Sequence, residues 1–435
     1  MRLAPCLAGL LCMAIATVLY AYGSAGFYHG AFEIWGVHAF RYPFLDVDGT
    51  LAARDCARLG IDVFVLNPCD ILDRVHNYSP LWLVFPDLPP GHSDRVFVGY
   101  TMDMAFFISL AALPPAGDRQ ELLLRVAGTV STAVAYATER ANVDTVVFVL
   151  VIGAAVAMSG GFAVRWLGYA LAALAAGLKY YPATLMALAL RERPARLVGT
   201  WLTAAVLGGC FLTAYGHDLL LSLPNIPGGV AFGDVFGAED LRYEVSALLA
   251  PTSASQQTTV LVSWAVVATA ILLAASLVVG LWRRNDWSGA LDRLNDARRW
   301  PLLAGALVTV GCFVAGQNLD YRGIFILLLL PGLWTLGHDP AVRSWLPRSS
   351  AILAVLLMWE QAPRHWIEML DEGTGLPRAA SEAFVMELWF DVWVVREAAY
   401  WALMVVLLSV LAAFVARSPV LCKMRRMLPR HTIVS

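Results

Sequence analysis

The chain has 435 residues, of which 59% are hydrophobic and 15% are charged, and its mean hydropathy is +0.64. Soluble domains have roughly 45–50% apolar and about 25% charged residues, so this composition predicts an integral membrane protein and excludes an ordinary soluble enzyme. The net charge of −2 averages over both sides of a membrane, and nothing in the sequence suggests a nucleic-acid partner.

Apolar segments recur along the whole chain and predict one all-α polytopic domain, residues 1–435, with about twelve transmembrane or half-membrane helices. We expect these segments near 5–24, 95–114, 121–138, 143–159, 166–178, 180–191, 197–215, 258–282, 300–316, 323–336, 350–361 and 393–416.

Lys and Arg gather in the connections between alternate segments, the longest of which is RRNDWSGALDRLNDARRW. Because basic connections stay on the cytoplasmic side, a multi-pass protein with both termini in the cytoplasm is expected. Three longer connections then face outward, at 28–94, 216–257 and 361–392. Most of the mass outside the membrane lies in them, so we expect the functional site at the outer face.

The first outward connection contains FLDVDGTLAARDCARLG, in which Asp46 and Asp48 precede a helical pattern closed by Gly60. Three interpretations are open. Asp48 or Thr50 caps the first helical turn, the two carboxylates bind a metal, or one of them is a catalytic base. Two carboxylates are too few ligands to predict a metal site, although a divalent cation is possible.

Two of the seven cysteines, Cys56 and Cys69, lie in this same connection. An outward-facing compartment permits a disulfide between them, and two free thiols are the alternative.

Lys179 interrupts the apolar run GYALAALAAGLKYYPATLMALAL. At about 1.5 Å per residue, each arm rises less than the roughly 30 Å of a bilayer core, and Pro182 favours a break. A shallow hairpin with Lys179, Tyr180 and Tyr181 near its outer tip is one interpretation. The other is a single tilted helix over 166–190 from which the lysine reaches the interface.

Polar residues also gather at two other segment boundaries, where one or two are expected to line a cavity and the rest to be solvated. They are Glu139, Arg140, Asn142 and Asp144, and then Gln317, Asn318, Asp320, Tyr321 and Arg322. Arg322 either pairs locally with Asp320 or binds a phosphate. Asp103, within an apolar segment, needs a partner or a water-filled cavity.

Four stretches occur in a characteristic order: GIDVFVLNPCDILDRVHNYSPLWLVF, ERANVDTVVFVLV, AALAAGLKYYPATLMALALRERPAR and GQNLDYRGIFILLLLPGL. In order and spacing they resemble the glycosyltransferase C superfamily, specifically family 87, whose membrane enzymes take a sugar from a polyprenyl phosphate. The resemblance covers most of residues 40–340. It departs from the family pattern at Phe64, at Tyr78-Ser79-Pro80 and at Ala141-Asn142, where the family usually has Gly-Asn.

The resemblance implies a glycosyltransferase C-like fold and transfer of a hexose or mannose-like sugar, with inversion, to a lipid, glycan or protein acceptor. It assigns Asp46 as the general base, since its 14-residue separation from Gly60 matches the family spacing. Asp48 is a second catalytic candidate. Lys179 and Arg322 would bind the donor phosphate, and the resemblance leaves open whether a divalent cation is needed. The substrate-binding residues would be His76, Tyr78, Asn142, Tyr181, Gln317 and Tyr321.

A bacterial plasma (inner) membrane is the expected location of such an enzyme of the cell envelope. Two other functions fit the same chain, namely a secondary transporter and a non-catalytic protein that binds polyprenyl lipids. Transporters place their polar residues near the membrane midplane, whereas here they gather at one face, which favours the enzyme.

Overall fold

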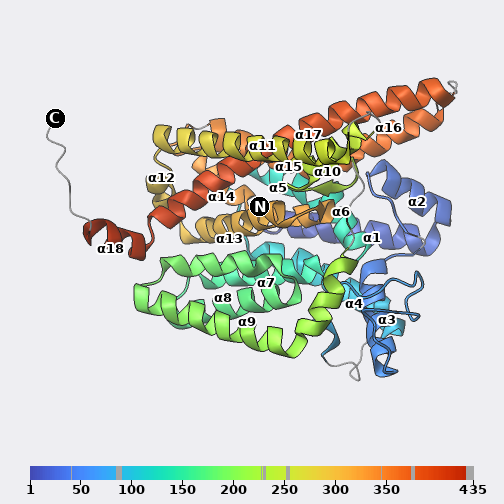
Figure 1. Ribbon diagram of the computed structural model, residues 1–435, viewed down its shortest axis with the longest axis horizontal. Helices are drawn as coiled ribbons and strands as arrows, with labels where there is room; N and C mark the ends of the chain where they lie inside the picture. The colour runs from blue at the N-terminus through green and yellow to red at the C-terminus, as the bar shows by residue number, and fades with distance from the viewer. Residues whose placement is uncertain are drawn as a thin grey trace.

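The computed structural model describes residues 1–40, 42–84, 91–226, 228, 232–250, 255–343, 345–373 and 378–427. The protein is all-helical (Figure 1), and the strands in these residues form one short antiparallel pair, β1 (Val235–Phe236) with β2 (Asn318–Leu319). Val235 pairs with Leu319 and Phe236 with Asn318, so this pair joins two distant parts of the chain.

The α-helices follow in chain order. They are α1 (Ala4–Tyr22), α2 (Ala25–Ile34), α3 (Leu45–Arg58), α4 (Arg95–Ser109), α5 (Arg119–Thr129), α6 (Thr132–Glu139), α7 (Asp144–Ala157), α8 (Phe162–Leu178), α9 (Pro194–Ser222), α10 (Asp240–Leu249), α11 (Gln256–Arg284), α12 (Trp287–Arg293), α13 (Asp296–Ala315), α14 (Leu330–Leu336), α15 (Trp345–Met358), α16 (Gln361–Gly373), α17 (Arg378–Ala416) and α18 (Pro419–Met427). The 3-10 helices are η1 (Pro80–Leu83), η2 (His92–Asp94), η3 (Leu110–Ala112), η4 (Tyr181–Arg191), η5 (Leu223–Asn225) and η6 (Asp320–Leu328).

Six helical stretches among the described residues are long and apolar enough to cross a membrane, rather than the twelve full or half spans expected. They are Ala4–Tyr22, His92–Ala112, Pro194–Asn225, Gln256–Arg284, Asp296–Ala315 and Leu388–Ala416. Helices α7, α8 and α15 are apolar but shorter. The segments expected at 121–138 and 323–336 are each divided between two elements. Six of the twelve expected segments therefore coincide with helices of span length, and the others are shorter or divided.

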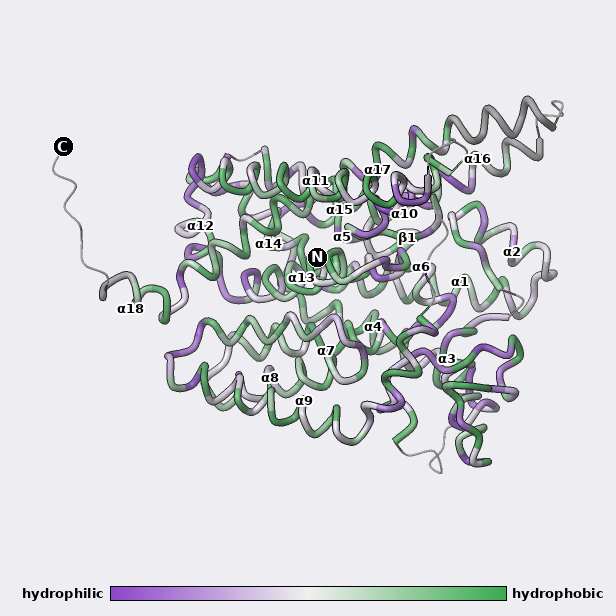
Figure 2. Tube along the Cα trace, in the orientation of Figure 1, coloured by the Kyte–Doolittle hydropathy of each residue, from purple (hydrophilic) through white to green (hydrophobic). Residues whose placement is uncertain are grey.

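The long helices lie roughly side by side (Figure 1), with α7, α8 and α9 on one side of α13 and α11, α15 and α17 on the other. Helices α2, α3, α10 and α16 lie at one end of this bundle, and α12 and α18 at the opposite end. Elements of the three connections expected to face outward therefore share one end. In Figure 2 hydrophilic residues gather around α12 and around α3, α10 and β1, while the middle is mostly hydrophobic.

The centre of the bundle packs around α7. This helix is apolar on all its faces, as expected for a helix that its neighbours cover on most sides. The ring of Phe148 in α7 contacts Phe106 of α4 and Phe325 of η6, with ring centroids 4.8 and 5.9 Å apart. All three side chains are almost completely buried. This packing fixes the N-terminus of α7 beside η6.

Candidate functional site

The first turn of α3 is held by main-chain carbonyl groups from the end of α6. The N–H groups of Phe44 and Asp46 donate to the carbonyl oxygens of Glu139 and Arg140, at 2.7 and 3.1 Å. Phe44, the residue before the helix, has a φ of 70° and makes no side-chain cap. The expected cap by Asp48 or Thr50 is therefore wrong, and the two aspartates lie inside the first turn rather than before it.

Asp46 is buried and faces a cavity. The side-chain amide nitrogen of Asn142 donates to its Oδ2 at 2.6 Å, and a guanidinium nitrogen of Arg74 lies 3.7 Å from its Oδ1. Arg74 is itself held by hydrogen bonds to both carboxylate oxygens of Asp70. The Asp46 carboxylate thus has a fixed orientation and a cation beside it.

Asp48 points in a different direction and does not line this cavity. It is fully buried, its Oδ2 accepts a hydrogen bond from the hydroxyl of Tyr42 at 2.9 Å, and Nδ1 of His92 lies 2.8 Å from its Oδ1. These contacts tie η2, the turn before α4, to α3, so Asp48 has a structural role.

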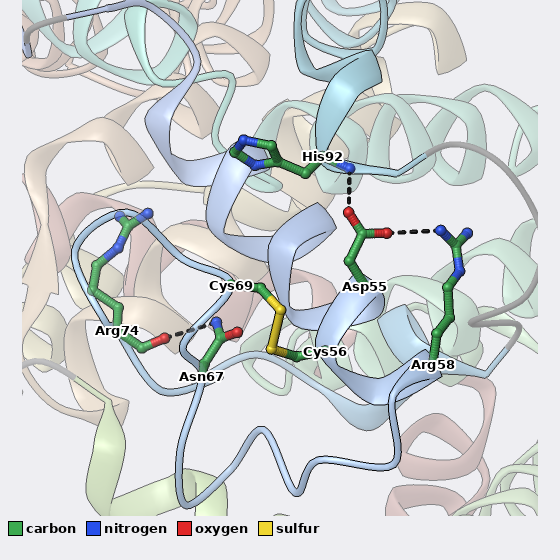
Figure 3. The surroundings of a disulfide bond; sticks show 7 residues. All are labelled: Asp55, Cys56, Arg58, Asn67, Cys69, Arg74 and His92. Atoms are coloured by element: carbon green, nitrogen blue, oxygen red, sulfur yellow. Dashed lines mark hydrogen bonds and ion pairs between the residues drawn. A yellow bond between two sulfur atoms is a disulfide. The ribbon is translucent and has the colours of Figure 1, made fainter.

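A disulfide joins Cys56 of α3 to Cys69 and closes the loop over residues 56–69, which is followed by the segment that carries Arg74 (Figure 3). The disulfide interpretation of the sequence is therefore correct. Nearby, the side-chain amide of Asn67 donates to the main-chain carbonyl of Arg74 at 2.9 Å. On the other side of α3, Asp55 accepts from the main-chain N–H of His92 at 2.8 Å. The segments that follow α3 are thus anchored to this helix by the disulfide on one side and by Asp55 on the other.

The chain breaks at Lys179, between α8 and η4. Lys179 has an extended backbone (φ −145°, ψ 139°), η4 begins at Tyr181 with Pro182 in its first turn, and α8 and η4 pack against each other. The hairpin interpretation is correct, and the single continuous helix is wrong. Its tip carries Lys179 into the cavity, where the ammonium group lies 5.2 and 5.4 Å from the ring centroids of Tyr78 and Tyr321.

Asp144, at the start of α7, lies next to two cations of the site, Lys179 and Arg322. Its Oδ2 lies 2.8 Å from the ammonium nitrogen of Lys179 and 3.6 Å from Nε of Arg322, and its Oδ1 accepts from the hydroxyl of Tyr181 at 2.6 Å. Arg322 also donates to Asn318. Arg322 therefore pairs with Asp144 rather than with its neighbour Asp320, whose carboxylate accepts from Gln361.

Asn142 connects the two halves of the site. While its amide nitrogen donates to Asp46, its Oδ1 lies 3.4 Å from the ammonium nitrogen of Lys179. This orientation matches the chemistry of the amide, which offers donors on one side and an acceptor on the other. Glu139, Asn142 and Asp144 are all buried, so the expectation that part of this cluster is solvated loop is wrong.

Burial sets the protonation of two groups at the cavity. It lowers the pKa of Lys179 to about 8, although the nearby Asp144 carboxylate opposes this shift. It also lowers the pKa of His76 to about 4, so the imidazole is neutral at pH 7. His76 is therefore suited to hydrogen bonding with a neutral group rather than to binding an anion.

The cavity has a volume of about 540 Å³ and combines these polar groups with apolar side chains. Most of the residues expected at the site line it, namely Asp46, His76, Tyr78, Lys179, Tyr181, Gln317, Tyr321 and Arg322. Asn142 lies behind the cavity wall and contacts two residues that line it, Asp46 and Lys179. Apolar residues of several elements complete the wall: Leu72, Leu178, Leu223, Ile226, Ala315 and Leu319.

Three cavity features had no role assigned from the sequence: Arg74, Arg140 and the central position of Asp144. For Arg140 and Asp144 the signal was present in ERANVD, whose charges stand between apolar segments. The turn in this stretch is formed at Ala141, which has a φ of 43° where glycine is favoured. Asp103 lines a separate cavity together with Glu139.

Among the described residues, one trio of acidic side chains is close enough to suggest a metal site: Asp240, Glu244 and Glu397. However, a guanidinium nitrogen of Arg396 lies 3.1, 3.3 and 3.4 Å from their carboxylate oxygens. The guanidinium of Arg396 thus lies among the three carboxylates, in the place that a bound metal ion would need. Gln317 links this cluster to the cavity wall by donating to Asp240 at 2.9 Å.

Comparison with known proteins finds no matching family model, no matching curated protein and no matching solved structure. The functional assignment therefore rests on the geometry above and on the sequence resemblance.

Asp144→Asn removes the carboxylate that holds Lys179 and Arg322 and leaves two buried cations without their counter-ion. We expect the free energy of unfolding to fall by about 3 kcal/mol, measured by thermal unfolding in detergent. Glu239→Gln breaks a more exposed ion pair with Arg242 and should change stability by less than about 1 kcal/mol. Equal stability of Asp144→Asn and wild type would show that Asp144 does not hold the cluster.

Proposed function

We propose that this protein is a membrane glycosyltransferase that moves a sugar from a polyprenyl phosphate to an acceptor hydroxyl. The observation that carries the proposal is the bridge through Asn142, which joins a buried carboxylate, Asp46, to a buried ammonium group, Lys179, in one cavity. Transfer from a lipid phosphate needs this pair of charges, a base for the acceptor and cations for the phosphate.

The reaction follows from where the charges lie. Asp46 takes the proton of the acceptor hydroxyl as the acceptor oxygen forms its bond to the anomeric carbon of the sugar. The bond between that carbon and the phosphate oxygen breaks, and its electron pair stays on the phosphate. Lys179 and Arg322 stabilise the added negative charge, so no acid is needed to protonate the leaving group. A single displacement of this kind inverts the anomeric carbon.

The surroundings of the cavity support a lipid donor. Its apolar wall includes residues from the α8 hairpin and from η5, next to helices of membrane-spanning length. A polyprenyl chain requires such a wall, while the sugar requires hydroxyl and amide groups, which Tyr78, Tyr181 and Gln317 offer. The sequence resemblance to glycosyltransferase family 87 leads to the same donor, to a glycosyltransferase C-like fold and to a site at the outer face.

The position of the cavity also argues against the transporter alternative. Asp46 and Arg74 come from the region of α3, which lies at one end of the bundle. A transporter binds its substrate near the middle of the membrane. A lipid-binding protein without catalysis would use the same cations, and it differs from the enzyme in having no need of Asp46.

Replacing the base tests catalysis directly. With a donor found by screening mannosyl and glucosyl polyprenyl phosphates, Asp46→Asn should lower turnover by about 10²–10⁴-fold and still bind polyprenyl phosphate. Asp48→Asn is the matched control, since its carboxylate is as buried but faces Tyr42, and it should keep most of the turnover. Full activity of Asp46→Asn with loss in Asp48→Asn would contradict the assignment of the base.

The pKa of Lys179 predicts a pH dependence of donor binding. Because this pKa is lowered to about 8, the ammonium group loses its proton as the pH rises through 8, while a phosphate monoester is fully charged throughout this range. The affinity for undecaprenyl phosphate should therefore fall between pH 7 and pH 9 in fluorescence titrations. Lys179→Arg, which stays charged, should remove this fall. An identical pH profile in both proteins would mean that Lys179 does not bind the phosphate.

A further inference from the structure

Arg140 lines the same cavity but has no part in the reaction described above. Its guanidinium lies over two aromatic rings, 4.4 Å from the ring centroid of Phe40 and 4.3 Å from that of Tyr136. Both rings belong to residues with fixed positions. The hydroxyl of Tyr136 donates to Asp234, and the main-chain N–H of Phe40 donates to Glu139 at 3.2 Å. The cation is therefore held in place before any ligand arrives.

Within the described part of the chain, no carboxylate forms an ion pair with Arg140, and its buried Nε has no hydrogen-bond partner. The other cavity cations differ in this respect. Arg74 is paired with Asp70, while Lys179 and Arg322 share Asp144. The neighbouring carboxylate of Glu139 is turned away toward Tyr28, whose hydroxyl donates to it at 3.3 Å. Among the described cavity residues, Arg140 is thus a cation without a direct ion pair, on which the carboxylates of Asp46 and Glu139 act only from a longer distance.

Arg140 also stands close to the proposed base. Its main-chain carbonyl accepts from the N–H of Asp46, so the two residues keep a fixed separation. Two aromatic rings lie between it and the donor cations, because it stacks on Tyr136, Tyr136 contacts Tyr321 at 5.6 Å, and Lys179 lies over Tyr321. A ligand group bound by Arg140 would therefore lie near Asp46 rather than near the donor phosphate.

We propose that Arg140 forms a second anion-binding subsite and that the acceptor carries a phosphate or carboxylate group beside its reacting hydroxyl. An arginine held by rings presents two parallel N–H donors to such a group, an arrangement that favours these anions over neutral sugars. The acceptor assignment rests on the proposed function, whereas anion binding by Arg140 does not.

The test measures binding of a second anion while the donor subsite is filled. Protein in neutral detergent is saturated with undecaprenyl phosphate and titrated with dodecyl phosphate, with dodecanol as the neutral probe. We expect dodecyl phosphate to bind wild type and to bind Arg140→Gln about tenfold more weakly or not at all. Arg140→Lys should recover part of the affinity, and undecaprenyl phosphate should bind Arg140→Gln as it binds wild type.

Arg95→Gln is the matched control. Arg95 also lies over a ring, 4.5 Å from the centroid of Tyr42, and its Nε is likewise buried without a partner, but it lies outside the cavity. It should bind dodecyl phosphate as wild type does. Competition by inorganic phosphate would indicate a soluble anion as the natural ligand, and its failure to compete would indicate a lipid-borne group.

Equal binding of dodecyl phosphate by Arg140→Gln and wild type, or binding of dodecanol as strong as that of dodecyl phosphate, would overturn the subsite. If wild type bound no undecaprenyl phosphate, the donor assignment would fail. Binding of dodecyl phosphate that depended on Arg140 would then still support the anion subsite.

Discussion

The site depends on the ion pair between Asp144 and Lys179. Asp144 stands at the N-terminus of α7, where the helix dipole and the side chains of Lys179, Arg322 and Tyr181 stabilise its charge. The same carboxylate thereby brings together the tip of the α8 hairpin and the start of η6. Without it, two buried cations would face each other, and the hairpin would lose the contact that directs its tip into the cavity.

A buried group of this kind is costly, which is an argument for function. Taking ions out of water is offset only when their geometry and hydrogen bonds are good, and apolar side chains of similar size usually give equal or better stability. Here three charged side chains meet at a cavity, in a protein with helices that can span a membrane. Perturbed ionisable groups with specific charge partners in a cleft are candidates for a functional site.

Local patterns in the sequence predicted much of this arrangement. The break at Lys179 followed from the length of the two apolar arms and from Pro182, and the pairing of Cys56 with Cys69 was one of two stated alternatives. Most cavity residues were found because they stand at the ends of apolar segments. Composition did not separate full spans from shorter segments, because a 3-10 helix or a divided helix has the same composition as a continuous span.

What escaped prediction depends on contacts between distant parts of the chain. The start of α3 is capped by carbonyl groups about a hundred residues away, so its own side chains gave no correct signal. The role of Asp48 depends on His92 and Tyr42, and the role of Asp144 depends on Lys179 and Arg322. These contacts could not be predicted from periodicity or spacing in the sequence, because they form only when distant helices pack together.

The most direct test of this account is native mass spectrometry of the purified protein with polyprenyl phosphate and ordinary phospholipids in competition. The account predicts selective retention of polyprenyl phosphate by wild type, clearly weakened in Lys179→Ala and in Arg322→Ala and unchanged in Arg284→Ala, which alters the far end of α11. Equal retention of all lipids, or equal binding by all four proteins, would contradict a lipid phosphate at the Asp144 cluster.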